Sequence, residues 1–251
     1  MTVLTLAEKY KKSEKWIRTQ LDQYKLPKWE PKPRAMVAIM DATYTGDSWM
    51  LVVRDPHAKE NVYVREYTHE TTFAYQEAKR ALEEQGFVFM AIVGDGRVAT
   101  PWLFSDVPVQ MCHFHQIQII IRYTTLNPKL EAGQELLDLV RTLPNTDEAS
   151  FTDAFNQWCR TWDTFLKECA TDTTTGRKRY THRNLRAART SIRQHLPYLF
   201  TYTKHPELNI PNTTNSLDGS FGKVKKSIGI HSGLKRTRRI KMITSLITKS
   251  V

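Results

Sequence analysis

Two long apolar runs place the tightest limits on how this chain can fold. The first, AMVAIM, leads into Asp41, and the second, FVFMAIVG, leads into Asp95. Short uninterrupted apolar runs bounded by polar or turn residues are typical of strands that are buried on both faces of a sheet. Between them, the stretches SWMLVVRD and NVYVREYT predict two further strands. The chain is therefore expected to form a mixed α/β sheet that is covered by helices.

A helix is predicted over residues 71–86, with Gly86 as its C-terminal cap. The apolar stripe expected on this helix consists of Phe73, Ala74, Ala78, Ala81 and Leu82. Residues 100–200 carry apolar side chains at helical spacing and are expected to be mostly helical. Within them, Trp158 and Trp162 are interpreted either as core residues or as a stacking platform for an unpaired base.

The positive charge of the chain is confined to its two ends. The formal net charge is +11, with 37 lysines and arginines against 26 acids. Residues 1–34 carry +5, residues 35–176 carry −9 and residues 177–251 carry +15. Basic ends around an acidic middle indicate a polyanionic partner, although a solvated basic tail would give the same balance.

The first 26 residues predict a helix-turn-helix, in which Lys11 and Lys12 form the turn and Ser13 caps the second helix. In this motif the second helix lies in the major groove. The expected DNA contacts there are Lys12, Ser13, Lys15, Trp16 and Thr19. The same pattern also suits a helical hairpin that packs on the next domain. Residues 27–34 contain three prolines and predict a linker.

The end of the chain is expected to form one or two basic helices. Their predicted apolar stripe is Leu217, Phe221, Val224 and Ile228. The basic residues expected to bind DNA phosphates in this part are Lys223, Lys225, Lys226, Lys235, Arg236, Arg238 and Arg239.

Composition excludes several classes of protein. Apolar residues make up 40% of the chain, and no run has the length of a membrane span. The sequence MTVLTLAEKYKK lacks the pattern of a signal peptide, so a soluble intracellular protein is expected. Three cysteines cannot form a disulfide framework. Cys112 and His115 have the spacing of two zinc ligands, but Cys159, Cys169 or His182 would have to complete the set, and a packing role is favoured over zinc.

Asp41 and Asp95 occupy matching positions at the ends of buried strands, where an unpaired carboxylate is costly and a metal ion would offset the cost. Asp218 is the best third acid, because only Glu207 and Asp218 are acidic after residue 176. Three carboxylates can hold two divalent cations, and Mg²⁺ or Mn²⁺ suits such ligands. Alternatively, each strand-end aspartate forms a turn, and Asn215 and Asp218 cap a helix together.

Five motifs in this order carry a family resemblance: AIMDATYTGD, AIVGDGR, MCHFH, NTTNSLDGSFGKVKK and IHSGL. They resemble those of the RNase H-like DDE transposases of bacterial insertion sequences, above all their Mutator-related group, over residues 36–125 and 205–245. The resemblance implies that Asp41, Asp95 and Asp218 are the catalytic acids, although the third acid is commonly Glu in these enzymes. Some members also begin with a zinc ribbon, and its absence here would fit a shortened copy.

The resemblance implies a DNA transposase that uses two metal ions to cleave DNA and transfer the cut strand. Its partners would be the double-stranded DNA of transposon ends and target, and it would act as a homo-oligomer, without a membrane, in the cytoplasm at the nucleoid. Alternatives are a truncated, non-catalytic regulator that binds transposon ends, and a structure-selective nuclease. The expected domains are a helix-turn-helix (1–26), a linker (27–34), the first part of an RNase H-like core (35–125), a helical insertion (126–204) and the last part of the core (205–251).

Overall fold

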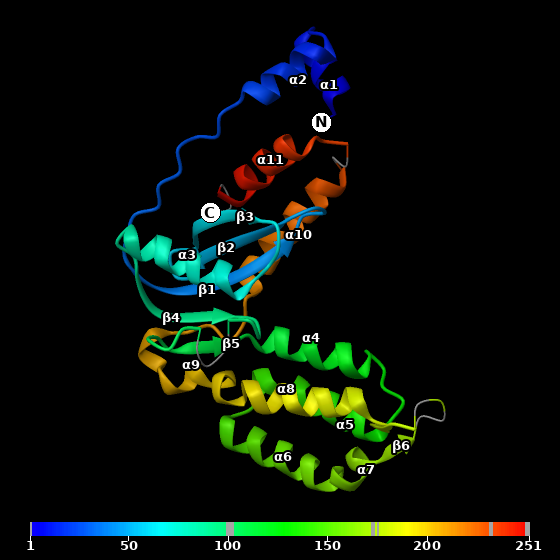
Figure 1. Ribbon diagram of the computed structural model, residues 1–251. Helices are drawn as coiled ribbons and strands as arrows, with labels where there is room; N and C mark the ends of the chain where they lie inside the picture. The colour runs from blue at the N-terminus through cyan, green and yellow to red at the C-terminus, as the bar shows by residue number, and fades with distance from the viewer. Residues whose placement is uncertain (1, 99–102, 172–173, 175, 231–232, 249–251) are drawn as a thin grey trace. The chain divides into compact units, whose positions relative to one another are not determined.

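The protein combines a mixed sheet with helices, which confirms the predicted α/β class. The computed structural model describes residues 2–98, 103–171, 174, 176–230 and 233–248. Five strands form a mixed sheet in the order β3-β2-β1-β4-β5, and β6 and β7 form a separate two-stranded sheet (Figure 1). Contacts divide the chain into two compact units: unit 1 comprises Met1–Val88 and Asn215–Val251, and unit 2 comprises Phe89–Thr214.

Unit 1 contains the three strands predicted first. They are β1 (Ala35–Tyr44), β2 (Trp49–Asp55) and β3 (Glu60–Tyr67). Each is antiparallel to the next, so that Asp41 of β1 lies opposite Val52 of β2, and Val52 lies opposite Val64 of β3. Nearly all of β1 and β2 is buried, as expected from their apolar runs.

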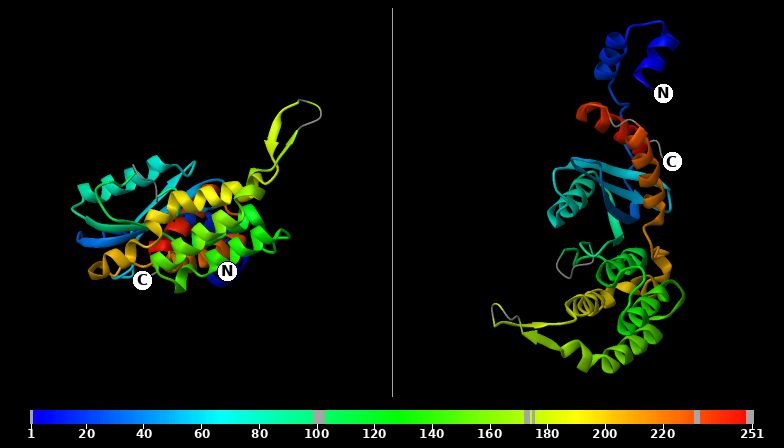
Figure 2. Two further views of the ribbon diagram at one scale, coloured as in Figure 1. Left: turned by 90° about the horizontal axis from the view of Figure 1, so that it is seen from below. Right: turned by 90° about the vertical axis from the view of Figure 1, so that its right-hand side faces the viewer.

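Helices cover both faces of these strands. Helix α3 (Thr72–Glu84) lies on one face and α10 (Asn215–Ile230) lies on the other, and both views in Figure 2 show this arrangement. Helix α11 (Arg236–Thr248) packs against β3. Of the stripe predicted on α10, Leu217, Phe221 and Val224 are buried.

The predicted end of α3 is confirmed, because Gly86 has a φ of +93° just past the helix. The predicted apolar stripe of α3 is wrong at one position. Phe73 is 63% exposed, whereas Ala74, Tyr75, Ala78 and Leu82 are buried. Because each helical residue turns the side chain by about 100°, Phe73 lies to one side of this stripe.

Unit 2 contains β4 (Val88–Gly94) from Phe89 onward, the parallel strand β5 (Val109–Met111) and most of the helices. Its helices are α4 (His113–Thr124), α5 (Glu131–Arg141), α6 (Glu148–Thr161), α7 (Asp163–Lys167), α8 (Arg183–Leu199) and α9 (Thr201–Lys204). Helix α4 packs on α5 and α8, and α5 packs on α6. None of the helices in the described ranges is both long and apolar enough to cross a membrane.

The two tryptophans of α6 and the turn after it are placed by packing. Trp158 is 5% exposed and its Nε1 donates a hydrogen bond to the Ala132 carbonyl at 3.0 Å, which confirms the core interpretation for this residue. Trp162 is partly exposed and donates to Glu135 Oε2 at 2.7 Å.

Three short strands fall where mostly helix was expected. They are β5, β6 (Cys169–Thr171) and β7 (Lys178–Tyr180), each three residues long. A three-residue strand is too short to show an alternating pattern, so hydrophobic periodicity could not reveal it.

Candidate active site and DNA-binding surfaces

Asp41 lies within β1, which continues to Tyr44, so the expected position at the end of the strand is wrong for this residue, and so is the alternative of a strand-end turn. Asp41 is buried, with 6% of the residue exposed. Its Oδ1 accepts a hydrogen bond from the backbone N–H of Ala42 at 2.9 Å. A carboxylate buried in an apolar strand is costly unless cations or hydrogen-bond donors compensate for its lost hydration. The Ala42 N–H supplies one such donor to Asp41.

Asp218 lies in the first turn of α10, and its side chain is partly exposed. The preceding residue, Leu217, is buried and belongs to the apolar stripe of α10. Helix α10 packs against β1. The structure thus brings the helix that carries Asp218 onto the strand that carries Asp41. Helix α10 begins at Asn215 itself, whereas the capping interpretation needs Asn215 one position before the helix.

Asp95 directly follows β4 and belongs to unit 2. Its Oδ1 accepts hydrogen bonds from the backbone N–H groups of Arg97 at 2.9 Å and Val98 at 3.4 Å. Asp95 therefore forms the strand-end turn that was the alternative interpretation. This role is compatible with metal binding, because a carboxylate has about four lone-pair sites and both of these bonds use Oδ1.

The structure adds His195 of α8, a residue that the sequence did not single out, to the surroundings of Asp95. A Cβ atom on Gly96 would lie 2.9 Å from Cε1 and 3.0 Å from Nε2 of His195, so the imidazole packs directly against the turn. Its Nδ1 lies 2.6 Å from Gln116 Oε1, which can only accept, so Nδ1 carries the proton. Burial lowers the pKa of His195, and the charge of Asp95 opposes this shift.

The three predicted acids offer the oxygen ligands that Mg²⁺ prefers. Asp41 and Asp218 belong to unit 1, and Asp95 belongs to unit 2. Among the described residues, no three His, Cys, Asp or Glu side chains are grouped to hold a metal ion by themselves. Mg²⁺ is commonly held by one or two carboxylates, with water and substrate phosphates completing its shell. The donor chemistry of the acids and the burial of Asp41 therefore fit a divalent cation.

The Cys-x-x-His motif ties the start of α4 to the end of unit 2. Cys112 is buried, and its Sγ accepts the backbone N–H of Thr214 at 3.4 Å. Burial raises the pKa of the Cys112 thiol, but hydrogen bonds from His115 and Thr214 and the charge of His115 outweigh burial and leave this pKa below its usual value. His113 anchors the same helix, with Nε2 donating to the Leu199 carbonyl at 2.7 Å.

The residues suggested as further zinc ligands have other surroundings. Cys159 is buried on α6, and Cys169 lies exposed on β6. The His182 ring stacks on the Phe165 ring, and its Nε2 lies 3.0 Å from Glu168 Oε2. Within the part of the chain that the structure describes, none of them completes a metal-ligand group with Cys112 and His115.

The N-terminal residues form the two predicted helices, α1 (Val3–Tyr10) and α2 (Glu14–Gln23). The expected N-cap is confirmed, because Ser13 Oγ accepts the backbone N–H of Trp16 at 3.2 Å. The five predicted DNA contacts, Lys12, Ser13, Lys15, Trp16 and Thr19, are all exposed. Helix α2 also packs on α11, so the hairpin has a packed side and a free side.

The C-terminal basic residues fall into two groups. Lys223, Lys225 and Lys226 of α10 and Lys235 before α11 are exposed. The three arginines of α11 form ion pairs within unit 1. Arg238 binds both carboxylate oxygens of Asp22, at 2.5 and 2.6 Å, and thereby holds the pKa of Asp22 below its ordinary value.

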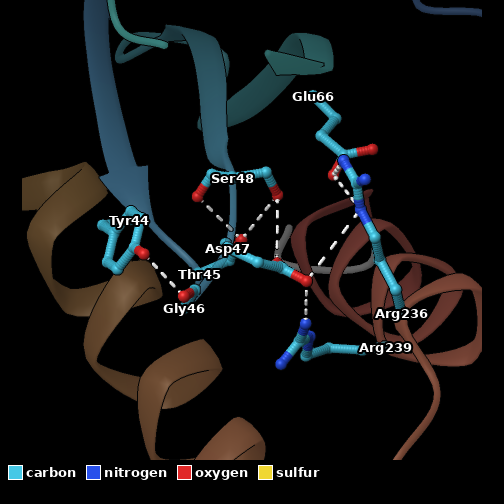
Figure 3. Close-up of polar contacts among 8 residues, drawn as sticks. All are labelled: Tyr44, Thr45, Gly46, Asp47, Ser48, Glu66, Arg236 and Arg239. Atoms are coloured by element: carbon cyan, nitrogen blue, oxygen red, sulfur yellow. Dashed lines mark hydrogen bonds and ion pairs between the residues drawn. The ribbon is translucent and has the colours of Figure 1, made fainter. Parts of the chain in front are cut away.

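Figure 3 shows the other two arginines at the turn between β1 and β2. Arg239 pairs with Asp47, and Arg236 Nη2 lies 2.8 Å from Glu66 Oε1. The side chains of Arg238 and Arg239 are only 12% and 17% exposed. Arg238 and Arg239 were predicted to bind DNA. In the structure Arg238 holds α11 against α2, and Arg239 holds α11 against the β1–β2 turn. The sequence could not reveal this, because their acidic partners are far away along the chain.

His231 and Ser232 of the IHSGL motif lie outside the described residues. No protein-family model matches the chain, and no curated protein matches it. The fold is that of a mixed α/β protein. Unit 1 has one carboxylate buried in β1 and another on the helix that packs against β1, and unit 2 has a carboxylate directly after β4.

Proposed function

We propose that the protein is a DDE-type DNA transposase with an RNase H-like core. The observation that carries this proposal is the packing of α10, with Asp218 in its first turn, against β1, where Asp41 is buried. An RNase H-like core requires acids on a central strand and on a late helix. The strand order β3-β2-β1-β4-β5, with three antiparallel strands followed by a parallel pair, supports the same fold.

In this proposal Asp41 and Asp218 of unit 1 and Asp95 of unit 2 would supply carboxylate ligands for two Mg²⁺ or Mn²⁺ ions. When bound, these ions would activate the attacking oxygen and stabilise the leaving oxygen at phosphorus. The strand around Asp41 orients its carboxylate through the Ala42 N–H, and His195 supports the turn that holds Asp95. The Cys112–His115 pair has a packing role, without zinc.

The exposed basic residues of the N-terminal hairpin and of α10 would bind the phosphates of transposon ends and target DNA. We propose that the protein acts as a homo-oligomer on paired ends, in the cytoplasm at the nucleoid. Because phosphate contacts carry no sequence information, recognition of the ends would come from base contacts of α2 in the major groove.

The test is a strand-transfer assay on short duplexes that carry the DNA flanking the coding region, with Mg²⁺ or Mn²⁺. Asp41→Asn and Asp95→Asn should each lower cleavage and joining by about 100-fold or more, the order of magnitude lost when one preorganised electrostatic contact to the transition state is removed. Asp218→Glu should retain activity, because these enzymes commonly carry Glu there. Asp153→Asn, at an exposed position on α6, is the matched control.

DNA affinity is measured alongside, since it should change little in these variants. Joining retained in Asp41→Asn or Asp95→Asn would overturn the active-site assignment. Binding by the wild-type protein without cleavage would favour the non-catalytic regulator, and cleavage without joining would favour the nuclease.

A further inference from the structure

The β6–β7 hairpin of unit 2 carries a concentrated positive charge. Arg177, Lys178 and Arg179 are consecutive, and all three are exposed. Four more arginines follow in α8, and two acids, Glu168 and Asp172, precede the triplet in the sequence. In the described part of the chain, no ion pair engages the side chains of these three residues.

The geometry of the hairpin presents this charge on both of its sides. In β7, which pairs with β6 as Ala170↔Arg179 and Thr171↔Lys178, neighbouring side chains point to opposite faces. Lys178 and Tyr180 therefore share one face, and Arg179 lies on the other. All residues of both strands are exposed, and Figure 2 shows the hairpin extending away from the helices of unit 2.

The base of the hairpin is firmly attached. The Thr181 N–H donates to the Glu168 carbonyl at 2.9 Å, and the Arg186 guanidinium stacks 3.5 Å from the centroid of the Tyr180 ring. Arg186 also donates from Nη1 to the Leu166 carbonyl at 3.0 Å, which joins α8 to α7. A ribbon fixed at its base loses little conformational freedom when it binds a partner.

This hairpin differs from the basic residues of α11 in one decisive respect. Arg236, Arg238 and Arg239 are ion-paired with carboxylates of unit 1, whereas Arg177, Lys178 and Arg179 lack such partners among the described residues. No side chain of β6 or β7 is buried, so packing does not explain the composition of these strands. Exposed cations without internal partners are the ones that can replace the counterions of a polyanion.

We propose that the β6–β7 hairpin is a DNA-binding ribbon that enters the major groove of duplex DNA. The major groove of B-DNA, about 12 Å wide, admits a two-stranded β-ribbon. Cations on both faces would reach the phosphates on both sides of the groove. The inference rests on the proposed function and extends it, because it gives unit 2 a DNA contact in addition to those proposed for α2 and α10 of unit 1.

The first experiment measures DNA binding by fluorescence anisotropy as a function of salt. The triple variant Arg177→Ala, Lys178→Ala, Arg179→Ala should reduce the slope of log K against log salt by between about 2 and 3, since each phosphate contact contributes about 0.9. At about 0.15 M salt this corresponds to a loss of affinity of roughly 100-fold. The matched control removes three other exposed charges: Lys32→Ala, Arg80→Ala, Arg160→Ala.

The charge-preserving variant Arg177→Lys, Arg179→Lys should keep the wild-type slope. It also tests the ribbon independently of the alanine substitutions. An RNA duplex of the same sequence should bind the ribbon more weakly, because the deep, narrow major groove of A-form RNA does not admit side chains.

The second experiment uses a natural thiol as a probe of proximity. Cys169 pairs with Tyr180 in the hairpin and is the one exposed cysteine of the chain, since Cys112 and Cys159 are buried. A thiol-specific photo-cross-linker on Cys169 should attach to bound duplex DNA. The control Cys169→Ser, Glu84→Cys moves the thiol to an exposed position on α3 and should cross-link far less.

The outcomes separate this inference from the proposed function. If the triple variant matches its control in slope and Cys169 does not cross-link, the ribbon is refuted while metal-dependent joining still supports a transposase. If the ribbon binds but the wild-type protein joins no DNA, the inference holds and the catalytic proposal fails. Preferential cross-linking to the RNA duplex, or no salt-dependent DNA binding by the wild-type protein, would overturn the ribbon.

Discussion

Replacing Asn61 with alanine should detach the end of α11 from β3. Asn61 is 2% exposed, and its Oδ1 accepts a hydrogen bond from Arg54 Nη1 at 2.9 Å. Its Nδ2 donates to the Ile247 carbonyl at 2.6 Å. The last four carbonyls of a helix have no partner within the helix. Asn61 therefore caps the C-terminal end of α11 from a neighbouring strand.

The magnitude follows from the two groups that lose a partner. A hydrogen bond to a charged group such as Arg54 contributes about 2 kcal/mol, and leaving the buried Ile247 carbonyl unpaired costs about 1 to 2 kcal/mol more. The free energy of unfolding of unit 1 should therefore fall by about 3 to 4 kcal/mol. For a protein of this size the melting temperature should fall by roughly 10 °C.

The assay is thermal unfolding followed by circular dichroism, together with hydrogen exchange of α11. The exchange measurement localises the effect, since the amides of α11 should lose protection while those of unit 2 keep theirs. Asn156→Ala, at an exposed position on α6, should change the stability by no more than about 0.5 kcal/mol. A loss below about 1 kcal/mol, or unchanged exchange in α11, would refute the reasoning.

Two further substitutions test unit 2. Gly96→Ala should destabilise unit 2 by about 1 to 3 kcal/mol, because the new methyl group would lie within 3.0 Å of the His195 ring. The control is Gly222→Ala, which should not destabilise the protein because a new methyl group there has no neighbouring atom within 4 Å. Thermal unfolding compares the two variants. Burial lowers the pKa of His113, so the unfolded chain binds more protons below about pH 6.5 and stability should fall as the pH drops from 6.5 toward the folded pKa. His113→Gln can still donate to the Leu199 carbonyl and should lose less stability than the wild type between pH 7.5 and 5.5 in denaturant unfolding, the remaining loss coming from groups such as His195. Equal losses in both proteins would contradict the assignment.

The strands and α3 could be predicted because their signals are local. An apolar run, an alternating stretch and a helix ending at Gly86 each depend on neighbouring residues, and β1, β2, β3, α3 and β4 appear where expected. The short strands could not be predicted in this way. β5 is three buried residues without alternation, and all residues of β6 and β7 are exposed, so no hydrophobic pattern marks them.

The candidate site divides along the same line. Asp41 and Asp95 could be chosen as candidates because an acid after an apolar run is a local signal, but that signal did not show that β1 continues past Asp41 to Tyr44. His195 could not, because its place beside Gly96 arises only when α8 packs on α4 and positions the ring through Gln116. A histidine in a basic helix carries no mark of that position in the sequence.

The availability of positive charge is the property that sequence alone leaves undetermined. Counted along the chain, Arg238 and Arg179 are equivalent basic residues, but Arg238 is bound by Asp22 and Arg179 is exposed without an ion pair in the described ranges. The same salt that weakens DNA binding also screens the ion pairs that hold α11, whose carboxylate partners Asp22 and Asp47 are accessible to solvent. A salt titration therefore reports on DNA contacts only over the range of salt in which the hydrogen exchange of α11 stays constant. The slopes of log K against log salt for the β6–β7 variants must be compared within that range.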